Sequence, residues 1–84
     1  IQAQTEQCIR NIEKALSHFG AQLKDVVRVR YLLPDASSFS LCWPILKAAF
    51  GDHPPAATMW EANLADPKMK IEIECTAYIA SEAE

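Results

Sequence analysis

The 84-residue sequence lacks the marks of several large protein classes. No apolar run approaches the roughly 18 residues of a membrane-spanning helix, and no basic-then-apolar signal peptide is recognisable. Basic residues are also scarce, since 8 Lys and Arg against 11 Asp and Glu give a net charge of −3. Because phosphates are bound by clustered Lys and Arg, the sequence predicts neither a membrane nor a nucleic acid as partner.

Paired cysteines are absent as well. Cys8, Cys42 and Cys75 are odd in number and widely separated, and no CxxC spacing occurs. Such a pattern is typical of free, buried thiols in a reducing compartment, rather than of a disulfide framework or a metal site. The sequence therefore predicts a cytoplasmic protein with no metal and no cofactor.

The chain also lacks an initiator methionine, because it begins at Ile1. Half of its residues are hydrophobic, which predicts a globular fold, but 84 residues lie near the lower limit for one core. We expect residues 1–84 to be a single domain and about the C-terminal two-thirds of a natural one, with N-terminal strands missing. The last four residues predict a frayed acidic end.

Hydrophobic spacing predicts a first helix over residues 5–19. Thr5 is its expected N-cap and Gly20 its C-terminal stop. Its expected apolar stripe consists of Ile9, Ile12, Leu16 and Phe19.

A second helix is expected to end at Phe50, with N-cap candidates among residues 35–38. Pro44 complicates it, because a proline in a helix interior costs about 3 kcal/mol. Two alternatives stay open: the helix kinks at Pro44, or it begins near Trp43 with Pro44 in its first turn.

Alternating patterns predict the strands. In "DVVRVRYLLP" one face would carry Val27, Val29, Tyr31 and Leu33, and the other Val26, Arg28, Arg30 and Leu32. "ATMWEA" predicts a short strand, and "KMKIEIECTAYIA" is the clearest one, with Ile71, Ile73, Cys75, Ala77 and Ile79 on one face. The order helix, strand, helix, strand, strand predicts an α/β fold with both helices on one face of a mixed sheet.

The other face of this sheet would carry charges of both signs. Arg28 and Arg30 on one strand would lie near Glu72 and Glu74 on another. The expected apolar companions on that face are Val26, Leu32 and Tyr78. A semi-apolar face with paired charges is typical of an interface, so we expect subunits to pack through it.

Three ordered motifs resemble the RidA (YjgF/YER057c/UK-type) family. They are "L-x-D-V-V" at residues 23–27, "FG-x-H-P-P-A" at residues 50–56 and "K-I-E-I-E" at residues 70–74. The resemblance implies a chorismate-mutase-like fold (bacillus type) assembled as a homotrimer. It places a small-molecule ligand in clefts between subunits, and it implies additional N-terminal strands.

The resemblance also implies hydrolysis of reactive enamine or imine intermediates to a keto acid and ammonia. Glu72 matches the family glutamate near the attacking water. Ala57 stands where deaminating members carry an arginine for the substrate carboxylate. Trp43 stands where they often carry an asparagine. We expect these residues, with Thr58 and Arg30, to line the cleft.

Three functions stay open. The first is a trimer that binds a small metabolite, with the standard 2-imino or enamino acid deaminase activity lost or altered. The second is an active imine, enamine or amide-type hydrolase that uses Glu72, with a substitute clamp such as Arg30. The third is an interaction protein whose vestigial pocket is filled, most readily by Trp43.

Overall fold

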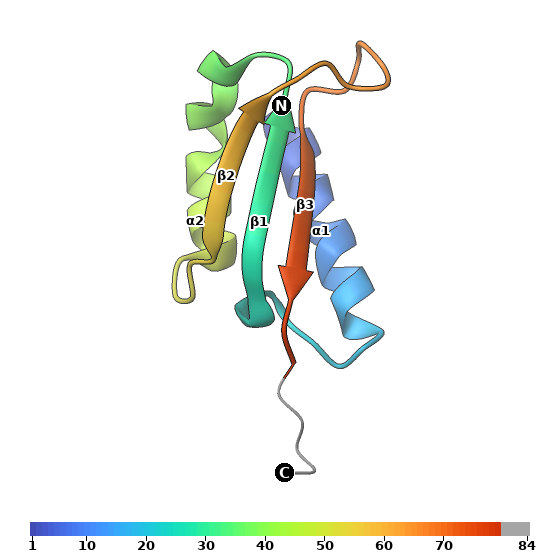
Figure 1. Cartoon of the computed structure of the whole chain (residues 1–84), viewed down its shortest axis with the longest axis vertical. Coiled ribbons are helices and arrows are strands. Elements are labelled where there is room, and N and C mark those ends of the chain that lie inside the picture. The colour runs from blue at the N-terminus through green and yellow to red at the C-terminus, as the bar shows by residue number, and fades with distance from the viewer. Residues whose placement is uncertain (80–84) are drawn as a thin grey trace.

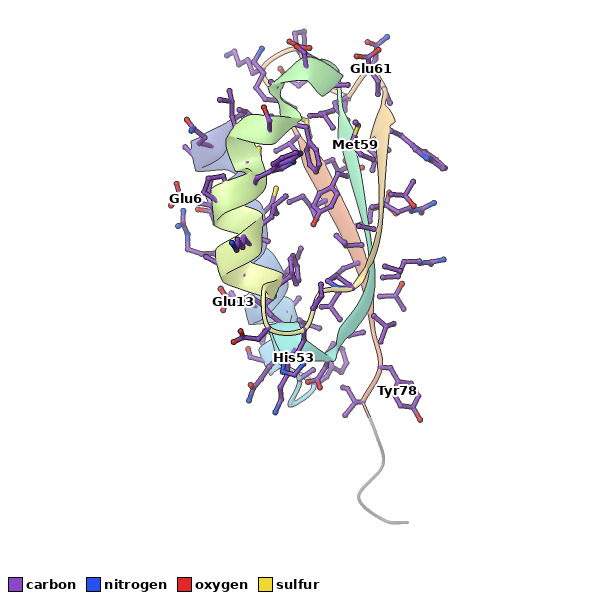
Figure 2. The ribbon with its side chains drawn as sticks, turned by 90° about the vertical axis from the view of Figure 1, so that its left-hand side faces the viewer. Glu6, Glu13, His53, Met59, Glu61 and Tyr78 are labelled. Carbon is purple, nitrogen blue, oxygen red and sulfur yellow. The ribbon has the colours of Figure 1, made fainter. Side chains whose placement is uncertain are left out.

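The computed structural model describes residues 1–79 and contains two α-helices and a three-stranded sheet (Figure 1). The α-helices are α1 (Gln2–Ser17) and α2 (Trp43–Phe50), and the strands are β1 (Val26–Leu33), β2 (Ala56–Glu61) and β3 (Glu72–Ala77). The sheet order is β2-β1-β3, with β1 parallel to β2 and antiparallel to β3. Both helices cover the same face of the sheet (Figure 2), which confirms the predicted α/β layout.

Helix α1 begins three residues earlier than predicted. Thr5 lies inside the helix and is fully buried, so it is not the N-cap. Its hydroxyl donates to the Ile1 carbonyl at 2.8 Å, which satisfies a polar group in the core. Phe19 lies beyond the helix end and is 76% exposed, so the stripe ends at Leu16. Gly20 terminates the segment as predicted, with a φ of 71° that favours glycine.

The second of the two alternatives for Pro44 is confirmed. Residues Ala36–Cys42 form a 3₁₀ helix, and the Asp35 carboxylate accepts a hydrogen bond from the Ser37 backbone N–H at its start. Helix α2 then begins at Trp43, with Pro44 in its first turn. A proline there removes no intrahelical hydrogen bond, because the first N–H groups of a helix have no partner in it.

Strand β1 departs from the predicted alternation at its first two residues. Val26 is buried on the helix-covered face, whereas Val27 is exposed, the reverse of the prediction. The cause is a register irregularity between Val26 and Arg28 in the pairing with β3, because a bulge shifts every preceding side chain to the opposite face. After Arg28 the predicted alternation is confirmed, and Val29, Tyr31 and Leu33 are buried.

The two other strands are shorter or more exposed than their patterns predict. Strand β2 begins at Ala56, and all its residues are exposed. Strand β3 covers only Glu72–Ala77, although Ile71 before it is buried in the core. Ala80, the last residue of the predicted strand, and the acidic end at residues 81–84 lie outside the described residues.

Candidate functional site

A groove of about 740 Å³ lies between α2 and the β1–β2 half of the sheet. Its walls are mostly apolar and come from the 3₁₀ helix, α2, β1, the loop before β2 and β2 itself. Helix α2 contributes Trp43, Leu46 and Phe50, strand β1 contributes Val29 and Tyr31, and the loop before β2 contributes prolines. The volume lies in the range of small-molecule sites, about 300–1,000 Å³.

The loop between α2 and β2 forms one edge of this groove. At Gly51 a Cβ atom would clash with the Lys47 carbonyl oxygen. Glycine therefore allows the backbone to pass close to this carbonyl group at the end of α2. Pro54 and Pro55 follow and fix the backbone before β2. Ala57, the second residue of β2, is in register with the buried Val29 and lines the groove.

The five site residues expected from the sequence lie on two faces of the sheet. Ala57 and Trp43 line the groove on the helix-covered face. Thr58 is in register with Arg30, and Glu72 with Leu32, so these residues share the opposite face. Within one chain the five do not meet.

We call that opposite surface the open face, made by Val27, Arg28, Arg30, Leu32, Thr58, Trp60, Glu72, Glu74, Thr76 and Tyr78. The Arg30 guanidinium pairs with the Glu74 carboxylate at 2.7 Å and lies 5.5 Å from the Trp60 ring centre. Arg28 donates to the Thr76 hydroxyl at 3.4 Å. The cross-strand charge pairing expected from the sequence is therefore present for Arg30 and Glu74.

Three polar residues that the sequence did not single out as site residues line the groove: Tyr31, Ser40 and Lys47. Tyr31 lies on β1, and desolvation raises its pKa to about 12, so the phenol stays protonated. Lys47 lies on α2 and is the single charged side chain lining the groove among the described residues. Only weak signals in the sequence indicate that these residues line a site. Tyr31 lies on the apolar face of its strand, which is typical of a core residue, and Lys47 is a single lysine within "WPILKAAF".

The cysteines belong to the core rather than to a nucleophilic site. All three are free, and the Cys42 sulfur lies 3.0 Å from the Thr5 hydroxyl oxygen. Burial raises the pKa of Cys8 and of Cys75, which disfavours the reactive thiolate. Within residues 1–79 no cluster of three potential metal ligands occurs, and no helix is long and apolar enough to cross a membrane.

His53 lies in the loop below α2 (Figure 2) and lines a smaller pocket beside the groove, rather than the groove itself.

Comparison with known proteins gives concordant matches. The family model described as Endoribonuclease L-PSP matches residues 1–79. A RutC family protein of Pyrococcus abyssi is 35% identical over 78 residues, which cover 93% of this chain and 61% of the relative. The chloroplastic Reactive Intermediate Deaminase A of Arabidopsis thaliana is 31% identical over 79 residues, with coverages of 94% and 42%.

A solved structure from Mycobacterium tuberculosis, described as a member of the YjgF/YER057c/UK114 family, matches with a TM-score of 0.86 and 38% identity. The match covers 89% of this chain and 64% of that one. The chain thus spans between 42% and 64% of the length of these three proteins. Together with the three motifs, these matches show that the chain belongs to the endoribonuclease L-PSP family, which is the RidA/YjgF family.

Proposed function

We propose that this protein is a homotrimer whose inter-subunit cleft binds a small metabolite, and that its 2-imino or enamino acid deaminase activity is lost or altered. The observation that carries the proposal is the position of Ala57 on the wall of the groove. An arginine there would direct a guanidinium into the groove. A methyl group offers no donor, and a charge-assisted hydrogen bond worth about 1.5–3 kcal/mol is absent.

The separation of Ala57 and Glu72 supports a cleft made by two copies of the chain. Strand β1 lies between β2 and β3, and the two side chains belong to opposite faces. A ligand that touches both must therefore lie where the groove of one copy meets the open face of another. Exposed Trp60 and Tyr78 give the open face apolar area for such a contact.

A second candidate function, an active hydrolase with a different substrate clamp, is favoured by one observation. The Glu72 carboxylate is exposed and accepts no hydrogen bond within residues 1–79, so it is available to position a water molecule. Arg30 is a poor substitute clamp, because Glu74 already neutralises it. A vestigial pocket is disfavoured, since Trp43 is 61% exposed and lines the groove without filling it.

The test is release of keto acid from freshly generated 2-iminobutyrate by the full-length protein and by Ala57→Arg. Ala56→Arg is the matched control, because Ala56 is in register with Arg28 on the open face. We expect an inert wild type, an active Ala57→Arg variant and an inert Ala56→Arg variant. Activity of the wild type would replace this proposal with the hydrolase.

Light scattering measures the assembly separately, and a monomer at micromolar concentration would contradict the trimer. The cytoplasmic location remains a prediction, because two relatives, from Schizosaccharomyces pombe and Arabidopsis thaliana, are named as mitochondrial and chloroplastic.

A further inference from the structure

The side-chain amide of Gln4 on α1 makes two hydrogen bonds to the loop between β2 and β3. Its Nε2 donates to the Lys68 carbonyl oxygen at 2.8 Å, and its Oε1 accepts from the Lys70 backbone N–H at 2.7 Å. A glutamine amide has a donor side and an acceptor side, so it pairs with a backbone C=O and N–H as a neighbouring strand would. The half-buried Gln4 side chain therefore ties the first helix to a loop more than 60 positions away.

The loop presents these two backbone groups through a turn of its own. The Asp66 Oδ1 atom accepts from the Lys68 backbone N–H at 2.8 Å, and the Asp66 carbonyl oxygen accepts from the Met69 N–H at 2.9 Å. In the part of the chain that the structure describes, the hydrogen bonds from residues 63–70 to other segments are the two made by Gln4. One side chain therefore holds the backbone of this loop from outside.

Glu72 follows two residues after Lys70 and is the first residue of β3. Its exposed side chain lies on the open face in register with Leu32, and Ile71 before it is buried in the core. The pairing of β3 with β1 ends at this residue, so the loop that leads into the strand also determines where the Glu72 backbone lies. A loop released at Lys70 allows the end of the strand to fray, which displaces the Glu72 carboxylate.

We propose that Gln4 is a positioning residue for Glu72. Its amide holds the Lys70 backbone in place, and this keeps the Glu72 carboxylate where it positions a water molecule in the cleft. The inference rests on the proposed function, in which Glu72 lies where the groove of one copy meets the open face of another. Gln4 is not one of the residues that line the groove, so it acts through the backbone before β3.

Hydrogen exchange of backbone amides, measured by NMR on the full-length protein, tests the two contacts directly. Gln4→Met removes both, and the Lys70 amide should exchange at least about fivefold faster. In Gln4→Glu a carboxylate oxygen still accepts from that N–H, so its exchange should stay within about twofold of the wild-type rate. The amide of Tyr31, in the central strand, is the reference for global unfolding.

Gln7→Met is the matched control for this experiment. Gln7 lies on the same helix, and among the described residues its side-chain amide pairs with Asn11 and Arg10 of α1 alone. The control should leave the exchange of Lys70 unchanged. An unchanged Lys70 rate in Gln4→Met, or equal acceleration in both variants, would overturn the proposal.

Enzyme kinetics distinguish a positioning residue from a merely structural one. In the Ala57→Arg background, Gln4→Met should lower kcat for 2-iminobutyrate about tenfold and change KM less than twofold, because the substrate contacts remain while Glu72 is displaced. Gln4→Glu should keep kcat within about threefold, and Gln7→Met should leave kcat and KM unchanged. A lower melting temperature with an unchanged kcat would overturn the positioning role.

A carboxyl signal separates this inference from the proposed function. If Ala57→Arg is inert, the proposed function fails, and carbon NMR of side-chain carboxyl groups in the wild-type background still tests Gln4. The Glu72 signal should shift or broaden in Gln4→Met, whereas the signal of Glu74, which Arg30 holds, should stay unchanged. Identical Glu72 signals in wild type and Gln4→Met would overturn the inference even where the assay shows activity.

Discussion

The two faces of the sheet use alternate residues of the same strand for different purposes. On the helix-covered face, Val29 and Leu33 are 0% exposed and form the core with residues of both helices. On the open face, Arg30 pairs with Glu74, and Trp60 remains 52% exposed. The chain buries one face with its own helices, and the other keeps the polar and aromatic groups that a contact with another subunit would use.

This comparison also separates the groove from the charged residues of the open face. The groove and its polar residues Tyr31, Ser40 and Lys47 belong to the helix-covered side, whereas the Arg30–Glu74 ion pair and Glu72 belong to the open face. Tyr78 in Figure 2 lies on the side away from the helices, in keeping with this division. A substitution of a buried residue on the helix-covered face should therefore lower the free energy of unfolding of the single chain more than a substitution on the open face.

The largest expected effect distinguishes two neighbouring leucines of β1. Leu33→Ala should lower the free energy of unfolding by about 2–5 kcal/mol, because it removes fully buried methyl groups and leaves a cavity. Leu32→Ala, at a half-buried side chain on the open face, should cost less than about 1 kcal/mol in the dissociated chain. Urea denaturation at one fixed protein concentration measures both, and equal losses would contradict the division of the faces.

The next largest expected effect is the loss of stability against unfolding at alkaline pH. The pKa of Tyr31 is raised to about 12 in the folded chain, above the ordinary value of about 10 for an unfolded tyrosine. The neutral Tyr31 phenol therefore makes its full contribution to the free energy of unfolding below pH 10. Because the unfolded chain ionises first, this contribution, about 2–3 kcal/mol in total, is lost as the pH rises from 10 to 12.

Tyr31→Phe should reduce this alkaline loss of stability, whereas Tyr78→Phe, at an exposed tyrosine, should leave it unchanged. Denaturation curves at pH 9 and pH 11 test the difference. Identical alkaline losses in wild type and Tyr31→Phe would show that the Tyr31 hydroxyl is solvated in the folded state.

The smallest effect concerns the ion pair on the open face. The Arg30 and Glu74 side chains are 39% and 46% exposed, so a double-mutant cycle with Arg30→Met and Glu74→Gln should give a coupling of about 0.2–1 kcal/mol. The cycle is measured where light scattering shows dissociated chains. A larger coupling in the assembled protein would indicate that association desolvates the pair, and an unchanged one would argue against an interface here.

Much of the fold follows from local patterns that need no tertiary information. The glycine at residue 20 allows the positive φ that ends the first helical segment, and Asp35 caps the 3₁₀ helix through its own side chain. Alternation over residues 29–33 predicts the buried face of β1, because side chains of a strand point to opposite sides in turn. The family was equally readable, since its three motifs lie in the described chain.

Other features depended on contacts between distant segments. The bulge that exchanges Val26 and Val27 arises in the pairing of β1 with β3, about 50 residues away, and no local pattern encodes it. Thr5 is a core residue because Cys42 meets it there, 37 positions along the chain. Sequence spacing predicts an N-cap at such a threonine, because local spacing contains no information about a distant partner such as Cys42.

The sequence by itself determined the class of fold and the family, because both depend on residue identity and short-range spacing. It also places Ala57 where the family resemblance implies an arginine. Only the tertiary structure decided that Ala57 and Glu72 lie on opposite faces and that Tyr31 and Lys47 share a groove. The physical reason is strand register: a shift of one residue moves a side chain to the other face, and register is set by pairing between segments far apart in the chain.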